Sequence, residues 1–228
     1  MRQRVKTVLF IGLALIALFG MTACPQRAKP KAKPEEPPPG PQKVTFSVEG
    51  TPANGELKAM AGSTEITSGS KVPYGTTVTF TATVTAAEHY ADEWTIKGGS
   101  FKTGGKDGDT TATVQITGET EVKVTFSRYK SVAFGTDGAD LAEYLNTDTA
   151  ASDGIYYIKV TGLKAEHLKG DASNWPYTLS PLGAILNAAP TKKVALKLGG
   201  GITGLTDMQA CFFQCKSLVQ ITAIPKGV

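Results

Sequence analysis

Residues 44–50 read VTFSVEG, and this stretch sets a pattern that the following part of the chain repeats. Val44, Phe46 and Val48 are apolar, and the residues between them are polar. Because successive side chains of a strand point to opposite faces, this alternation predicts a β-strand with one buried face.

The same period of two continues as far as residue 128. Further strands are predicted at residues 56–61, 64–66, 76–85, 93–96, 110–116 and 121–126. Clusters of Gly, Pro, Asn and Ser separate them, as expected of turns. We therefore expect a small all-β domain over residues 43–128, with Tyr90 and Trp94 in its core. Asp107, Gly108 and Asp109 lack the further oxygen ligands of a calcium loop and predict a hairpin turn.

The order of landmark residues in this domain resembles the divergent internalin-type B-repeat, the "bacterial repeat" module of surface proteins. The resemblance implies a spacer or adhesion module without catalysis, and a polar insertion at residues 102–109 departs from it. The matching positions are Val44, Phe46, Gly50, Gly55, Val72, Gly75, Val78, Phe80, Ala82, Tyr90, Trp94, Val114, Ile116, Gly118, Val122, Val124 and Phe126.

Residues 129–228 alternate between strand and helix signals. Strands are predicted at residues 131–134, 155–160 and 193–198, with a short helical turn at 162–168. Asp137 is expected to cap one helix, and Ser180 another that has Pro181 at its first position. This alternation predicts parallel strands joined by helical crossovers.

Residues 208–228, MQACFFQCKSLVQITAIPKGV, resemble one repeat of the BspA-like leucine-rich family of bacterial surface proteins. The matching positions are Cys211, Phe212, Phe213, Cys215, Ser217, Leu218, Ile221, Ile224, Pro225 and Val228. The resemblance implies a strand at 219–223, a repeat core of Phe212, Leu218 and Ile221, and an α/β cap at residues 129–207. Since a stack generally needs three or more repeats, we expect a truncated reading frame, or else a cap that supplies the missing neighbours.

The expected fold class is therefore α+β and multidomain. An all-β B-repeat-like module would be followed by a small α/β cap that leads into a leucine-rich-repeat solenoid.

The first residues carry an export signal. Residues 1–24 read MRQRVKTVLFIGLALIALFGMTAC, with a basic start, an apolar run at 8–19 and small residues before Cys24. They predict a signal peptide over residues 1–23, with an uncleaved anchor helix as the alternative. The end of this stretch resembles the lipobox of spirochaete-type bacterial lipoproteins, which implies cleavage between Ala23 and Cys24 and lipidation of Cys24. Residues 24–42 then form a proline-rich linker that cannot bury a core.

Charge and cysteine usage exclude several classes of function. The net charge is +4, but three basic residues lie in the leader, so nucleic acid is not an expected partner. Cys211 and Cys215 are far in sequence from His89 and His167, so neither a metal site nor another cofactor is predicted. The glycine-rich residues 199–204 lack the lysine of a phosphate loop, and no G-x-S-x-G is present. No enzyme and no small-molecule substrate are predicted.

Together these features predict a lipoprotein held in the bacterial envelope through Cys24. The outer membrane or cell surface is favoured over the periplasmic leaflet, and a protein that faces the periplasm stays an open alternative. The resemblances imply adhesion or protein–protein interaction through the repeat region, with host matrix proteins or other cells as ligands. Open alternatives are a spacer lipoprotein, a non-binding fragment of a longer adhesin, and a subunit of an enzyme or cell-wall processing factor. Carbohydrate binding by residues 43–128 would need an exposed aromatic strip, and Trp94 has few aromatic neighbours in sequence.

Overall fold

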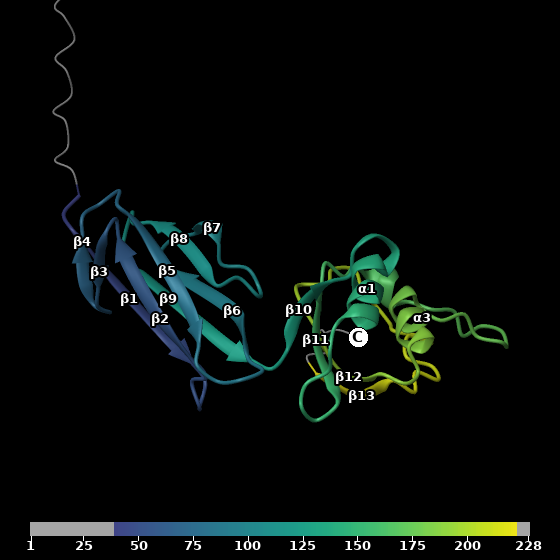
Figure 1. The fold of residues 1–228 in the computed structure, drawn as a ribbon. Coiled ribbons are helices and arrows are strands. Elements are labelled where there is room, and N and C mark those ends of the chain that lie inside the picture. The colour runs from purple at the N-terminus through teal and green to yellow at the C-terminus, as the bar shows by residue number, and fades with distance from the viewer. Residues whose placement is uncertain (1–38, 223–228) are drawn as a thin grey trace, which may run out of the picture. The chain divides into compact units, whose positions relative to one another are not determined.

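The structure is a computed structural model, and it describes residues 39–222. Within this range the chain forms three β-sheets and three short α-helices (Figure 1). All of these elements belong to one unit of the chain. The predicted signal peptide, Ala23, Cys24 and nearly all of the linker lie outside the described residues.

The first nine strands form a two-sheet sandwich (Figure 1). The first sheet has the order β4-β1-β9-β6 and the second has the order β3-β2-β5-β8-β7. In the first sheet β1 runs parallel to β9, from Val44 opposite Thr120 to Glu49 opposite Thr125. The strands are β1 (Gln42–Glu49), β2 (Gly55–Ala61), β3 (Thr64–Ile66), β4 (Ser70–Val72), β5 (Thr77–Val84), β6 (Tyr90–Lys97), β7 (Phe101–Gly104), β8 (Thr111–Gln115) and β9 (Thr120–Ser127).

Alternating side chains from both sheets fill the interior of the sandwich. Val78, Phe80 and Ala82 of β5 are buried, and the threonines between them face outward or are half-buried. The expected strand at residues 76–85 is thereby confirmed. Tyr90 is 39% exposed, so its predicted place in the core is wrong. Trp94 is buried as predicted: its ring packs edge-to-face on Phe101 with centroids 6.1 Å apart, and its indole Nε1 donates to the Asp109 carbonyl. A buried indole needs such a partner for its N–H group.

The remaining four strands form a third sheet in which all neighbours run parallel. Its strands are β10 (Lys130–Ala133), β11 (Ile155–Thr161), β12 (Lys193–Leu198) and β13 (Leu218–Thr222), in chain order. The predicted parallel arrangement is therefore confirmed.

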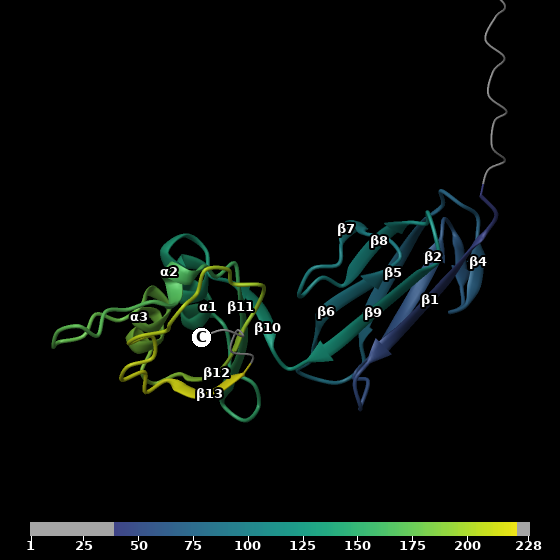
Figure 2. The same cartoon turned by 180° about the vertical axis from the view of Figure 1, so that it is seen from behind.

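Short helices cover one face of the third sheet (Figure 2). They are α1 (Ala139–Thr147), α2 (Ala165–Leu168) and α3 (Pro181–Ala188), with a 3-10 turn at Thr136–Gly138 before α1. Their leucines pack on Ile158, Val160 and Leu196 of the sheet in a shared apolar core. Ser180 caps α3 as predicted, because its Oγ accepts from the amide of Gly183 at 3.0 Å. No helix within residues 39–222 is long and apolar enough to cross a membrane.

The predicted fold class is wrong. The described residues are mainly β-sheet, with thirteen strands and only three short helices, instead of an α+β fold that leads into a solenoid. The reason lies in the connections of the third sheet. One helix joins β10 to β11, two helices join β11 to β12, and an irregular loop joins β12 to β13. Since a solenoid stacks similar units, these unequal connections do not form one.

Three local features also differ from expectation. The strands β4 and β7 were not predicted, because each is short and lies among turn residues. Asp137 does not cap α1: it lies in the 3-10 turn with φ of +51°, and Gly138 occupies the capping position without a side-chain hydrogen bond. Gly138 has φ of +84°, and a Cβ there would meet Ile185 Cδ1 at 1.8 Å. Only glycine fits this position without a shift.

Trp94 provides a test of the sandwich core. Trp94→Ala should lower the free energy of unfolding by about 3–5 kcal/mol, because it empties a buried aromatic site. The matched control is Trp175→Ala, whose side chain is 71% exposed and whose loss should cost less than about 1 kcal/mol. Urea unfolding of both variants measures the difference, and equal losses would place Trp94 outside the core.

Candidate functional site

The site residues predicted from the sequence occupy two different settings. Ala23 and Cys24 lie outside the described residues. Phe212, Leu218 and Ile221 are half-buried and pack against the core of the third sheet. Leu218 and Ile221 belong to β13, which begins one residue before the strand predicted at 219–223. These three side chains support the sheet and present no polar chemistry.

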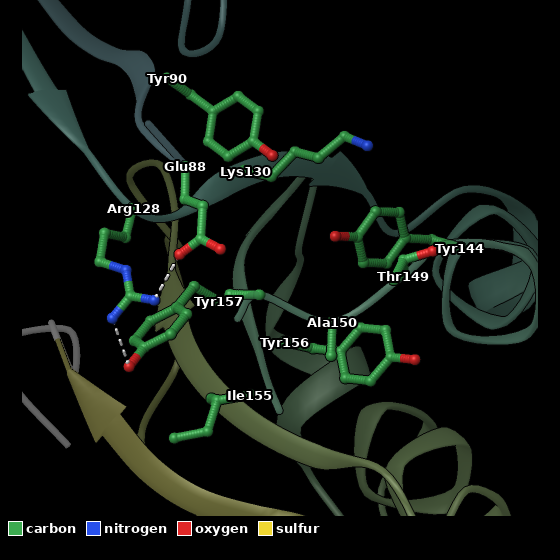
Figure 3. Close-up of a pocket in the computed structure, with 11 residues that line it drawn as sticks. Glu88, Tyr90, Arg128, Lys130, Tyr144, Thr149, Ala150, Ile155, Tyr156 and Tyr157 are labelled. Atoms are coloured by element: carbon green, nitrogen blue, oxygen red, sulfur yellow. Dashed lines mark hydrogen bonds and ion pairs between the residues drawn. The ribbon is translucent and has the colours of Figure 1, made fainter. Parts of the chain in front are cut away.

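A small pocket lies where the sandwich meets the third sheet (Figure 3). Glu88 and Tyr90 come from the sandwich, Arg128 from the connection between β9 and β10, and Lys130 from the start of β10. Tyr144, Tyr156 and Tyr157 contribute three aromatic rings to the wall. The volume of about 120 Å³ is well below the 300–1,000 Å³ that is usual for ligand pockets.

The charges of this pocket are neutralised by its own residues. Arg128 donates to Glu88 at 2.9 Å and to the Tyr157 hydroxyl at 3.0 Å (Figure 3). It also donates to Asp153 at 2.9 Å. A hydrogen bond from the amide of Ser152, together with Arg128, lowers the pKa of Glu88. Lys130 pairs with the carboxylate of Asp148. The ion pairs around the pocket therefore connect the sandwich to the third sheet, and they leave little charge to recognise a ligand.

A buried ion cluster makes a second connection between the sandwich and the third sheet. Lys159 of β11 donates from Nζ to Asp92 Oδ1 of β6 at 2.7 Å and reaches Asp107 Oδ2 at 2.9 Å. Lys197 of β12 donates to the other oxygen of Asp92 at 2.8 Å. The side chains of Lys159 and Asp92 are only 2% and 3% exposed. We call Asp92, Asp107, Lys159 and Lys197 the ion cluster.

Hydrogen bonding within the ion cluster outweighs the effect of burial on its protonation. Burial alone would raise the pKa of Asp92, but the hydrogen bonds from Lys159 and Lys197 hold that pKa below its ordinary value. Burial alone would lower the pKa of Lys159, but the hydrogen bonds to Asp92 and Asp107 raise it. Both groups are therefore charged at neutral pH, as a buried pair must be to offset its loss of hydration.

Removal of the central cation should destabilise the protein strongly. Lys159→Met leaves the buried Asp92 with one cation, and breaking a buried pair in this way costs about 3–5 kcal/mol. The control is Lys123→Met, which breaks the exposed pair with Glu49 at 2.8 Å and should cost at most about 1 kcal/mol. Chemical unfolding measures both variants. A Lys159 variant as stable as the control would show that the cluster contributes little.

The ion cluster also predicts how stability depends on acid. Because the pKa of Asp92 is lowered on folding, its contribution is complete above pH about 4 and is lost as the pH falls through the lowered pKa. Because the pKa of Lys159 is raised on folding, its contribution to stability is complete below pH about 10 and does not change in the acid range. Wild type should exceed Asp92→Asn in unfolding free energy at pH 7, and the gap should close toward pH 2. A gap that stays constant in a denaturant series over this range would contradict the assignment.

Among the described residues, the most exposed aromatic side chain lies on the loop that precedes α3. This loop, residues 169–180, projects away from the sheet and helices (Figures 1 and 2). Asp171 and Thr178 pair as an antiparallel bridge, with hydrogen bonds of 2.8 and 2.9 Å. Between them lie Trp175, which is 71% exposed, and Tyr177, which is 39% exposed. The bridge holds the two aromatic residues at the turn of the loop.

Phe213 joins these two residues from a different part of the chain. Its ring centroid lies 5.1 Å from that of Tyr177 and 6.0 Å from that of Trp175, and Trp175 and Tyr177 are 5.4 Å apart. All three pairs are edge-to-face, an arrangement that aromatic quadrupoles favour. We call Trp175, Tyr177 and Phe213 the aromatic patch.

Backbone-directed hydrogen bonds fix the segment that carries Phe213. The amide of Gly170 donates to the carbonyl of Gln209 at 2.9 Å, and Ser217 Oγ donates to the carbonyl of Leu186 at 2.7 Å. A Cβ on Gly183 would lie 1.8 Å from the Cys211 carbonyl oxygen, so this glycine permits α3 to approach the segment closely. The patch therefore rests on a segment tied to α3 and to the loop 169–180.

A hollow of about 310 Å³ adjoins the aromatic patch. Besides the patch it is lined by Pro176, Leu179, Asn187 and Gln214. No lining residue carries a formal charge at neutral pH, and the amides of Asn187 and Gln214 are exposed. The hollow thus combines aromatic faces with neutral hydrogen-bonding groups.

The chemistry of the cysteines does not indicate catalysis. Cys211 is buried, and burial raises the pKa of its thiol to about 11, although a hydrogen bond with Ser180 opposes the shift. Burial also raises the pKa of Cys215. A thiol that stays protonated at neutral pH is a poor nucleophile. Within residues 39–222 no group of three or more His, Cys, Asp or Glu side chains is placed to hold a metal ion.

Sequence reasoning missed both the ion cluster and the aromatic patch. Lys159 stands at a position of its strand that would be expected to face solvent, and no neighbouring residue indicates that it is buried. Trp175 stands in SNWPYT, and the presence of a tryptophan next to a proline in a polar loop was the one signal that could have drawn attention to it. The turn predicted at Asp107–Asp109 is present, but the pairing of Asp107 with Lys159 was not foreseen.

No protein-family model, curated protein or solved structure matches this chain.

Proposed function

We propose that this chain is a non-catalytic adhesion lipoprotein, held in the bacterial envelope by lipid on Cys24, with the aromatic patch as its binding surface. The observation that carries the proposal is the exposure of Trp175, at 71%, beside two further aromatic rings. Host matrix components or other cells remain the proposed ligands.

The exposure of the patch supports a binding role because the rings do not contribute the stability that their burial would give. An aromatic side chain left in water loses much of the about 1.5–3 kcal/mol that burial would contribute. Clustered apolar side chains on a surface mark interaction sites, and Trp and Tyr are the residues most enriched where binding energy concentrates. Single exposed apolar residues need no such explanation, but three rings in mutual contact do.

The leader supports the anchored location. A basic start, an apolar run too short for a comfortable span and small residues before Cys24 favour cleavage and lipidation. One acyl chain binds a membrane only marginally, so stable retention requires the two or more chains of a lipoprotein anchor. The outer membrane or the cell surface is the proposed site of display.

A second candidate is a spacer lipoprotein. The observation in its favour is the ion cluster, because the buried contacts of Lys159 and Lys197 with Asp92 couple the third sheet to the sandwich. Such a coupling suits a rigid spacer as well as a binding protein. The two candidates differ in the patch: a spacer has no use for Trp175, whereas an adhesin does.

A cell-binding experiment tests the proposal. Bacteria that display the full chain should adhere to immobilised glycosylated matrix, and Trp175→Ala should lower adhesion about tenfold or more, as for other central anchors. Tyr74→Ala, on the sandwich and 45% exposed, is the matched control and should leave adhesion unchanged. Cys24→Ser should release the chain from the membrane fraction.

The outcomes separate the candidates. Adhesion that is indifferent to Trp175→Ala, at equal display and stability, would refute the patch as the adhesive surface and favour the spacer. Retention of Cys24→Ser in the membrane would instead favour the uncleaved anchor helix.

A further inference from the structure

We infer that the hollow beside the aromatic patch binds a neutral carbohydrate, as a terminal or internal sugar unit of a surface glycan. This inference rests on the proposed function and names the chemical class of its ligand. Three properties of the hollow carry the inference: its lack of charge, its size, and its combination of ring faces with amides.

The lack of charge argues against ionic ligands. None of the residues that line the hollow is acidic or basic. A phosphate, sulfate or carboxylate group would leave water here without a charged partner, which is unfavourable. A nucleic acid or an acidic glycan would need basic side chains at this place. The lining therefore selects a ligand without formal charge.

The size of the hollow favours a small unit over a protein face. Its volume of about 310 Å³ lies at the lower end of the 300–1,000 Å³ that is usual for small-molecule sites. A stable protein–protein interface covers about 800 Å² on each partner, with an apolar centre. The loop around the patch is instead polar, with Asp171, Ser173, Asn174 and Thr178 exposed. One sugar unit on a longer glycan matches this small apolar spot with a polar rim.

The two kinds of lining group match the two kinds of surface on a sugar. The C–H groups on one face of a pyranose ring carry partial positive charge and pack against the negative face of an aromatic ring. Trp175 is 71% exposed and meets its neighbours edge-to-face, so ring surface stays open to a ligand.

The amides complete the match. The hydroxyl groups of a sugar both donate and accept hydrogen bonds, as do the side-chain amides of Asn187 and Gln214. Both residues are exposed, so their amides are accessible to a ligand. Both line the hollow from different segments, Asn187 from α3 and Gln214 from the segment next to Phe213.

The tryptophans of this chain allow a direct test. The chain has two, of which Trp94 is buried and Trp175 is exposed. The full chain with Cys24→Ser, which removes the proposed lipid, is titrated with soluble neutral oligosaccharides: cello-, malto-, chito- and manno-oligosaccharides of five or six units. At least one should shift the emission of Trp175 to shorter wavelength and protect it from acrylamide quenching. In Trp175→Phe, where Trp94 alone remains, the sugar should leave the emission unchanged.

Substitutions in the hollow should weaken binding in a set order. Calorimetric titration with the best oligosaccharide should show a loss of about tenfold or more for Trp175→Ala. Asn187→Ala and Gln214→Ala should each lose about fivefold, as expected when one hydrogen bond to the ligand is removed. Tyr74→Ala, outside the hollow, should bind like wild type. Since all four positions are exposed, circular dichroism should show that each variant folds.

Several results would overturn the inference. One is that no neutral oligosaccharide changes the emission of Trp175 or gives heat. A second is that Trp175→Ala binds the sugar as well as wild type. A third is that matrix protein stripped of its glycans binds as tightly as the glycosylated form through Trp175, which would make the ligand a peptide. A fourth is Trp175-dependent binding to phosphatidylcholine vesicles, which would make the ligand a lipid surface.

The failure of this inference differs from failure of the proposed function. If adhesion depends on Trp175 but free oligosaccharide does not compete with it, the sugar assignment fails and the adhesive role stands. If adhesion does not depend on Trp175 while oligosaccharide binds the purified chain, the hollow is a sugar site without the proposed adhesive role.

Discussion

The buried contact between Asp92 and Lys159 is the constraint on which the arrangement of the described chain depends. Each side chain would be unfavourable in the interior alone, and each is tolerated because the other lies 2.7 Å away. The two come from β6 and β11, so the contact holds only when the sandwich and the third sheet meet in one way. An apolar contact tolerates sliding, whereas a buried ion pair with two lysines on one carboxylate does not. The position of the aromatic patch relative to the sandwich follows from this contact.

All the strands except β4 and β7 were predictable because their signal is local. Alternation in stretches such as residues 44–48 shows which side chains turn inward, and the burial of Val44, Phe80 and Trp94 agrees with it. The cap at Ser180 was predictable for the same reason, since Ser180 and Gly183 lie within one turn. The fold class was not. A single stretch with the pattern of a repeat says nothing of whether similar units precede it. The three predicted helices are present, but they join the strands of the third sheet through connections of unequal kind.

The candidate site was not predictable because its parts are distant in sequence. Phe213 reaches Trp175 only through the hydrogen bonds that tie its segment to the loop and to α3. Lys159 occupies the polar position of an alternating strand, which indicates solvent by default. Lys159 is buried because one face of the third sheet, the face away from the helices, contacts β6. This contact joins elements distant in sequence, so no local pattern predicts it. The sequence signals for Cys24, by contrast, lie within a single contiguous leader.

The parallel pairing of β1 with β9 has a mechanical consequence. The chain enters the sandwich at the start of β1 and leaves it from the end of β9, toward the sheet that carries the patch. In a parallel pair these two points lie at opposite ends of the ladder. Tension between a membrane anchor and a bound ligand would load all the hydrogen bonds between β1 and β9 in shear at the same time. The bonds would not break one after another. Rupture under such tension is governed by the unfolding rate rather than by equilibrium stability, so in an anchored adhesin of the proposed kind this pair of strands would act as a tether that resists flow.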